Sequence, residues 1–164
     1  MAISASYRVA MSRALPGQFG DTSAYNIDGA CVLNNAEGNA TKNILVGVAV
    51  QHDGVDAMGN KMVKPMAASG KAYGVAVRSH FQTTSESGRM IYEVGSGINV
   101  MTEGRVWMLA DADIAAVAFD GDVKLDESGQ VSESGEITTS WKFTGDKTKF
   151  QDLFLVEVKV KPAA

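Results

Sequence analysis

The chain is poor in the residues on which covalent frameworks and many catalytic sites depend. It has a single cysteine, Cys31, among 164 residues, and this excludes an internal disulfide framework and a zinc site built on several cysteines. No stretch approaches the roughly 18 apolar residues of a membrane-spanning helix. Residues 1–20 lack the unbroken apolar run of a secretory signal. We therefore expect a protein that is made in a reducing cytosol and has no membrane partner.

Basic charge is also scarce. The chain has 15 Lys and Arg against 19 Asp and Glu, a formal net charge of −4, and no basic run interrupts this balance. Proteins that bind nucleic acid usually carry a basic stripe, so nucleic acid is not an expected partner. Most of the acidic excess lies in residues 111–136, where only Lys124 opposes it. This segment predicts either solvated turns or a face that repels its neighbours or meets a basic patch on a partner.

Helical periodicity is nearly absent, and the alanine-rich residues 110–118 predict one short helical turn at most. Short strands are expected at residues 44–50, 73–80, 97–101, 105–109, 123–125, 130–132 and 153–160. Residues 102–104 (TEG) are typical of a tight turn between two of them. In the last strand, alternating valines are expected on one face and Glu157 on the other. Many short strands separated by turn residues predict an all-β protein with a single antiparallel β-barrel or jelly-roll-like domain.

The first 28 residues differ from the rest, and we expect an extended N-terminal arm (1–28) followed by the barrel domain (29–164). The arm has no regular periodicity, and Pro16-Gly17 interrupts it. It nevertheless carries apolar side chains that need burial, of which the candidate contact residues are Tyr7, Met11, Leu15 and Phe19. One hypothesis is that the arm packs on a neighbouring molecule; the alternative is that it folds back on its own barrel.

Residues 53–68 form a second irregular segment. Met58, Met62 and Met66 recur every four residues, but Gly59-Asn60 and Pro65 favour a loop over a helix. Unbranched methionine side chains pack well on irregular surfaces. The segment is therefore a candidate contact loop, with a loop tucked over the mouth of the barrel as the alternative.

No catalytic, cofactor or metal site emerges from the sequence. Cys31 could pair in space with His52 or His80, but no local motif supports a nucleophile, and a buried, inert Cys31 is expected. Four acids in residues 120–127 lack the spacing of a calcium-binding loop and are expected at exposed hairpin ends. Trp107 and Trp141 are expected in the core. We therefore expect a protein that binds or builds, and not an enzyme.

Several motifs resemble one known family. Residues 15–17 (LPG) are followed by Asp21-Thr22, and a strand region is expected at 44–50. Residues 72–81 (AYGVAVRSHF) are similar to a Tyr-Gly-apolar element that continues with Val-Arg and an aromatic residue. Residues 97–106 (GINVMTEGRV) resemble a two-strand element with a central turn glycine. In this order they resemble the structural cement, or decoration, proteins of tailed-bacteriophage capsids.

The resemblance implies a β-barrel or jelly roll without active site or cofactor. It implies homotrimers on the outer surface of an icosahedral virion, where they stabilise contacts between neighbouring major capsid proteins after synthesis in the bacterial cytoplasm. Arg78 is then a candidate for an ion pair at an interface, with simple solvation on a strand surface as the alternative. The residues themselves also allow another virion β protein, such as a tail, head-completion or carbohydrate-binding adhesin component.

Overall fold

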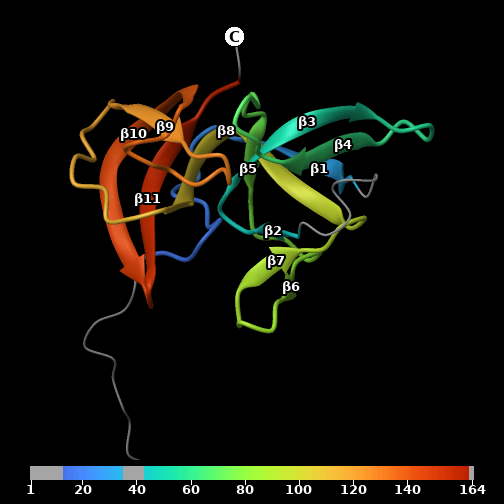
Figure 1. Cartoon of the computed structure of the whole chain (residues 1–164), viewed down its shortest axis with the longest axis horizontal. Coiled ribbons are helices and arrows are strands. Elements are labelled where there is room, and N and C mark those ends of the chain that lie inside the picture. The colour runs from blue at the N-terminus through green and yellow to red at the C-terminus, as the bar shows by residue number, and fades with distance from the viewer. Residues whose placement is uncertain (1–12, 35–42, 163–164) are drawn as a thin grey trace, which may run out of the picture.

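A computed structural model describes residues 13–34 and 43–162, and the structural statements below concern these ranges. They contain β-strands and no helix (Figure 1). The strands are β1 (Asn26–Leu33), β2 (Ile44–Leu45), β3 (Ala49–Val55), β4 (Lys61–Pro65), β5 (Gly74–Ala76), β6 (Thr83–Thr84), β7 (Met90–Tyr92), β8 (Gly97–Ala110), β9 (Asp122–Leu125), β10 (Ile137–Phe150) and β11 (Leu153–Val160). The expected all-β class is confirmed.

Five strands close into a barrel. Their order is β1-β4-β3-β5-β8, and β1 also pairs with β8, which completes the ring. All of these pairs are antiparallel except β1 with β4, which run parallel. Closure leaves no unpaired edge in this part of the sheet, and it confirms the barrel expected from the sequence.

The long strand β8 continues beyond the barrel into a second lobe. Its second half pairs with β11, and β10 and β9 follow in order. Val131 bridges both Leu125 at the end of β9 and Ala110 at the end of β8, so the chain returns to the strand where the lobe began. A small sheet, β2-β7-β6, lies beside the barrel (Figure 1).

The two lobes have separate cores, and β8 contributes to both. In its first half Ile98 and Val100 face the barrel core, and in its second half Trp107 and Leu109 do so. The residues of the opposite face belong to the core of the second lobe, and these are Met101, Val106, Met108 and Ala110. The inward positions therefore change from even to odd numbers between Val100 and Trp107, although a regular strand keeps one parity.

A β-bulge at residues 102–104 causes this change. Ile27 of β1 lies opposite Met101, whereas the preceding Asn26 lies opposite Glu103, so Thr102 is an extra residue in β8. Gly104 has φ 124°, a conformation that glycine adopts without a steric penalty. The prediction of a tight turn at 102–104 is thus wrong. Gly104 bends the single strand β8, because the two halves of β8 pair with different strands and not with each other.

Other elements also differ from those predicted by the sequence. Residues 44–50 divide into β2 and β3 around Gly47, whose backbone packs closely against Gly17. Of residues 73–80, only Gly74–Ala76 form a strand, and residues 110–118 form no helical turn. The irregular segment expected at 53–68 contains the end of β3 and all of β4, with a turn between them.

The expectations for the last strand and the large core residues are mostly confirmed. β11 covers the expected residues, and its alternating valines join the core of the second lobe. Trp107, Trp141 and Cys31 are buried. Nothing in the sequence indicated that Glu157 would be buried, but the structure buries it. Its carboxylate lies directly beside Gly20, so the N-terminal segment covers that face of β11.

Replacement of Gly104 by alanine tests the bulge. A Cβ atom at this position would lie 2.7 Å from the Cβ of Tyr25, and the backbone φ is unfavourable for an L side chain. We expect Gly104→Ala to lower the free energy of unfolding by at least about 2 kcal/mol. Gly54→Ala is the matched control, because Gly54 has φ 83° with no atom within 4 Å.

Gly54→Ala should lower the free energy of unfolding only by the backbone strain, about 1 kcal/mol. Urea unfolding of both variants followed by circular dichroism measures the difference. Equal losses for Gly104→Ala and Gly54→Ala would contradict close packing at the bulge.

Asp28 links the strands that close the barrel. It accepts hydrogen bonds from Tyr73 Oη and from Lys61 Nζ, the latter at 2.8 Å. Burial alone would raise the pKa of the Asp28 carboxyl, but the bonds from Lys61 and Tyr73 outweigh it and hold this pKa below 3.8. The ionised carboxylate therefore stabilises the folded state above the pKa of the unfolded chain, and this contribution disappears as the pH falls through the lower, folded-state pKa.

We expect Asp28→Asn to lower the free energy of unfolding at pH 7 by about 1–3 kcal/mol. The gap between variant and wild type should shrink progressively below about pH 4, as first the unfolded chain and then the folded wild-type carboxylate take up a proton. Tyr73→Phe, which leaves the Lys61 pair in place, should show an intermediate loss. Thermal unfolding between pH 2.5 and 7 provides the test, and a gap that stays constant with pH would refute the assigned role.

Candidate interaction surfaces

The described part of the expected arm lies along β8 of its own chain. The backbone N–H groups of Gly17 and Gly20 donate to the carbonyls of Trp107 and Arg105, each at 2.8 Å, and Trp107 N–H donates to Gln18 at 2.9 Å. This segment therefore occupies the edge of β8 opposite β11. β1 begins at Asn26, inside the range expected for the arm.

The four arm residues expected at an interface have different environments. Leu15 is half-buried, and the partly exposed Phe19 packs against Tyr25 with ring centroids 5.6 Å apart. Tyr7 and Met11 lie outside the described residues. For residues 13–20, the structure corresponds to the alternative in which the arm folds back on its barrel.

The three methionines of the candidate contact loop are not brought together. Met58 is 86% exposed, Met62 is half-buried on β4, and Met66 is 5% exposed in the core of the second lobe. The spacing of four does not define a face here, because the chain passes from a turn into a strand between the first two. Of the three side chains, Met58 is the one available to a partner.

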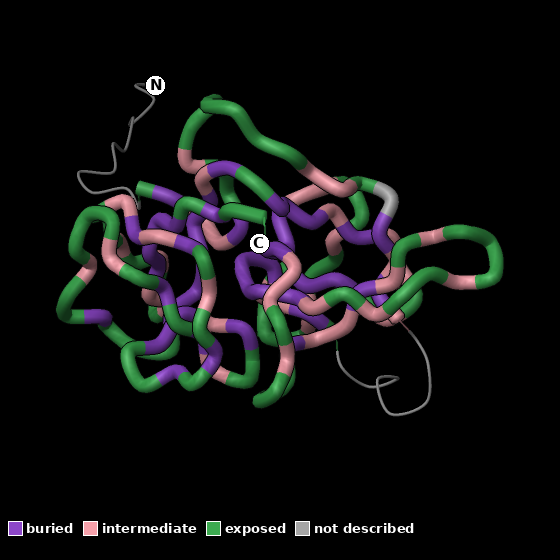
Figure 2. Tube along the Cα trace, turned by 90° about the horizontal axis from the view of Figure 1, so that it is seen from above, coloured by how far each residue is buried: buried purple, intermediate pink, exposed green. Residues whose placement is uncertain are grey.

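Met58 lies at the tip of the β3–β4 hairpin, which extends away from the barrel (Figures 1 and 2). Asp56 organises this tip: its side chain accepts backbone hydrogen bonds from Met58 and Asn60, both at 2.8 Å, and one from Asn60 Nδ2 at 2.9 Å. The Asn60 bonds, side-chain and backbone, lower the pKa of Asp56 below its ordinary value. Val55, 61% exposed, lies at the base of the turn. The hairpin is thus a preordered finger with apolar side chains exposed.

A cleft of about 200 Å³ lies where the arm, the small sheet and the β10–β11 hairpin meet. It brings together two residues that the sequence had singled out separately, Leu15 and Arg78. The other lining residues are mostly apolar and include Pro16, Leu45, Val46, Met90, Leu109, Phe150 and Leu153. Arg78 is positioned by its backbone, whose N–H donates to the Gly17 carbonyl at 3.1 Å.

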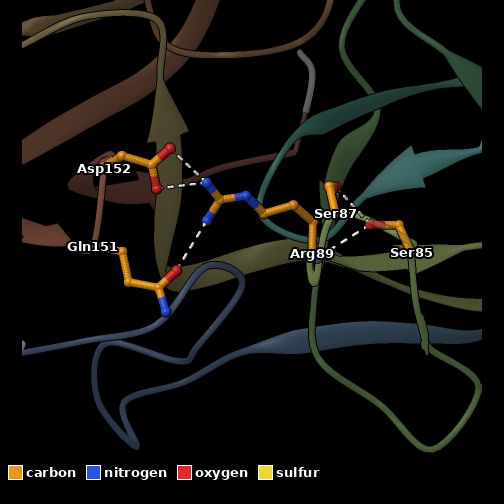
Figure 3. A network of polar contacts seen from close by, with 5 residues as sticks. All are labelled: Ser85, Ser87, Arg89, Gln151 and Asp152. Atoms are coloured by element: carbon orange, nitrogen blue, oxygen red, sulfur yellow. Dashed lines mark hydrogen bonds and ion pairs between the residues drawn. The ribbon is translucent and has the colours of Figure 1, made fainter.

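Arg89 lines this cleft and is the centre of the polar network drawn in Figure 3. Its guanidinium donates to Asp152 at 2.6 Å and to Gln151 at 3.3 Å, and these two residues form the tip of the β10–β11 hairpin. Its backbone N–H donates to Ser85 Oγ at 3.1 Å. The hydrogen bond from Arg89 lowers the pKa of Asp152. Arg89 therefore links the tip of the β10–β11 hairpin to the small sheet, and its guanidinium already has partners there.

Sequence reasoning missed Phe119, an aromatic residue that is 79% exposed. Its loop is fixed to β10: Asp120 N–H donates to the carbonyl of Phe143, and Phe143 N–H donates to that of Gly121, both at 2.9 Å. Lys147 Nζ adds a bond to the Ile114 carbonyl at 2.9 Å. The available signal was an aromatic side chain directly before Asp-Gly in the acidic segment, because a turn of that kind leaves it little to pack against.

Reactive groups are few in the described part of the chain. No group of three or more His, Cys, Asp or Glu side chains there could hold a metal ion. Burial raises the pKa of the Cys31 thiol to about 11, so it is protonated at neutral pH. No helix in residues 13–34 and 43–162 is long and apolar enough to cross a membrane.

Comparison with known proteins agrees with this architecture. The family described as "Structural cement protein (E217 gp24/Pam3 gp6)" matches residues 3–159. A chain of the solved structure "The capsid of Myoviridae Phage XM1" is similar in fold, with a TM-score of 0.60 and 17% identity over the whole of both chains. No curated protein matches.

The match to a structural cement protein family over nearly the whole chain places this all-β barrel among the structural virion proteins. The chain belongs to the phage structural cement protein family. Its role is structural and concerns the stability of a phage capsid.

Proposed function

We propose that the protein binds the outer surface of its phage capsid as a homotrimer and stabilises contacts between neighbouring major capsid proteins. Family membership supports a structural role at the capsid. The observation that carries the proposal of direct docking is the β3–β4 finger, which exposes Met58 on an ordered turn.

The finger suits insertion between shell subunits for two physical reasons. Because Asp56 already orders the turn, docking loses little conformational entropy. The unbranched, polarisable side chain of Met58 can adapt to an irregular apolar pocket. A rigid barrel behind the finger transmits any displacement of one shell subunit to the next.

A trimer would strengthen such contacts without a tight individual site. Once the first copy is docked, the others bind at a high effective concentration, so three weak contacts combine into strong attachment. The acidic character of the chain, with a net charge of −4, also favours solubility of the free protein before it reaches the shell.

Substitution of Met58 tests the finger. We expect Met58→Glu to raise the apparent Kd for bare, expanded capsids at least about tenfold, because a carboxylate cannot enter an apolar pocket without loss of hydration. Co-sedimentation in sucrose gradients, with saturation at rising protein concentration, measures this change.

Phe81→Ala is the matched control, since Phe81 is a half-exposed aromatic residue on another part of the surface. It should leave the Kd within about threefold of wild type, a shift of less than 1 kcal/mol. If Met58→Glu binds like wild type, the finger is not a capsid contact. If the wild-type protein does not bind capsids at all, the proposed function itself is wrong.

A further inference from the structure

The cleft between the arm, the small sheet and the β10–β11 hairpin combines apolar walls with one cation that lacks a partner among the described residues. Leu15, Met90 and Phe150 contribute to its walls. Arg89 is neutralised by Asp152. Arg78 is a half-buried residue, and its side chain makes no hydrogen bond or ion pair with any residue that the structure describes.

A cation held against apolar surface favours a particular kind of occupant. Water screens it incompletely there, so a carboxylate that arrives beside an apolar side chain gains a charge-assisted hydrogen bond and buries apolar area at once. Residues 1–12, the first part of the arm sequence, contain no Asp or Glu. This stretch of the chain therefore cannot supply the carboxylate.

A carboxylate beside an exposed apolar side chain is present elsewhere on the same chain. Phe119, 79% exposed, is followed directly by Asp120. Asp120 has φ 61°, a left-handed conformation that few non-glycine residues adopt, and its backbone bond to Phe143 fixes the loop. The nearby Lys142 forms its ion pair with Asp122, at 2.6 Å, and Asp120 has no ion pair within residues 13–34 and 43–162.

The symmetry of a trimer requires two complementary surfaces on each chain, and the Arg78 cleft and Phe119–Asp120 are complementary. A ring of three identical chains cannot use a self-complementary patch; each copy must offer two different surfaces, one for the neighbour on either side. An apolar–acidic knob at Phe119–Asp120 and an apolar–basic socket at Arg78 are two such surfaces.

We propose that Phe119 of one copy inserts into the Leu15–Arg78 cleft of the next copy, where Asp120 pairs with Arg78. This inference rests on the homotrimer of the proposed function and identifies the contact that closes it. The knob is preordered by β10 and the socket by Arg89, so neither side has to fold on binding.

A charge exchange tests the contact. Arg78→Glu and Asp120→Arg should each raise the dissociation constant of the trimer at least tenfold. The double variant should recover most of the lost affinity, because the introduced arginine of each copy then meets the introduced glutamate of the next. Phe119→Ala should weaken the trimer to a similar degree. Mass photometry and light scattering over a range of concentrations measure the distribution of monomers and trimers.

Matched controls separate this effect from general charge and folding effects. Lys124→Glu reverses an exposed cation on β9, and Asp111→Arg reverses an exposed acid in the same loop as the knob. Both should leave the trimer intact. Asp120→Asn removes the charge but tolerates the left-handed backbone, so it serves if Asp120→Arg melts at a lower temperature than wild type.

Each outcome decides the inference. Trimers that persist in both single charge variants would overturn the contact while leaving the homotrimer in place. If Arg78→Glu remains trimeric but no longer co-sediments with capsids, the cleft receives a shell protein and the inference is wrong. A wild-type protein that is monomeric both in solution and, by chemical cross-linking, on capsids would refute the proposed homotrimer and the inference with it.

Discussion

The fold depends on one constraint in β8: a single strand must present correct faces to two different cores. A regular strand that fits the barrel core would point polar and apolar residues the wrong way in the second lobe. The extra residue at Thr102 and the positive φ of Gly104 correct the alternation where β8 leaves β1 and joins β11. The two lobes can therefore share a strand, and a displacement of one is transmitted to the other through continuous backbone.

Residues 13–20 cover the edge of β8 that no described strand pairs with in its second half. β11 covers one edge of its second half, and the arm covers the other through backbone bonds at Trp107 and Arg105. Without that cover, the edge would expose unpaired backbone groups and Glu157 would face water. The same segment contributes Leu15 and Pro16 to the lining of the cleft. One segment therefore both covers the edge of β8 and forms part of the cleft wall.

The resulting molecule suits a structural role. Rigid parts carry the exposed apolar groups: an Asp56-ordered turn presents Met58, and backbone bonds to β10 hold the loop of Phe119. These groups lie on separate elements, one on the β3–β4 hairpin and the other beside β10, so one can serve the shell and the other a second copy. Such an arrangement favours many modest contacts over one strong site, as expected where symmetry multiplies each contact.

The sequence alone determined the features that depend on local patterns. Many short strands separated by turn residues predicted the all-β class, and period-two alternation predicted the strand at 153–160. Trp107 and Trp141 were expected in the core, and both are buried. The family followed from short motifs in a fixed order. Tertiary structure decided whether Thr102–Gly104 turned the chain or bent a strand, since a glycine permits both and only the pairing partners select one.

Tertiary structure likewise separated Met58 from Met66 and brought Leu15 beside Arg78. It also left Phe119 exposed and buried Glu157. Each of these depends on which distant segments meet, and contacts between residues far apart in the chain leave no periodic trace in the sequence.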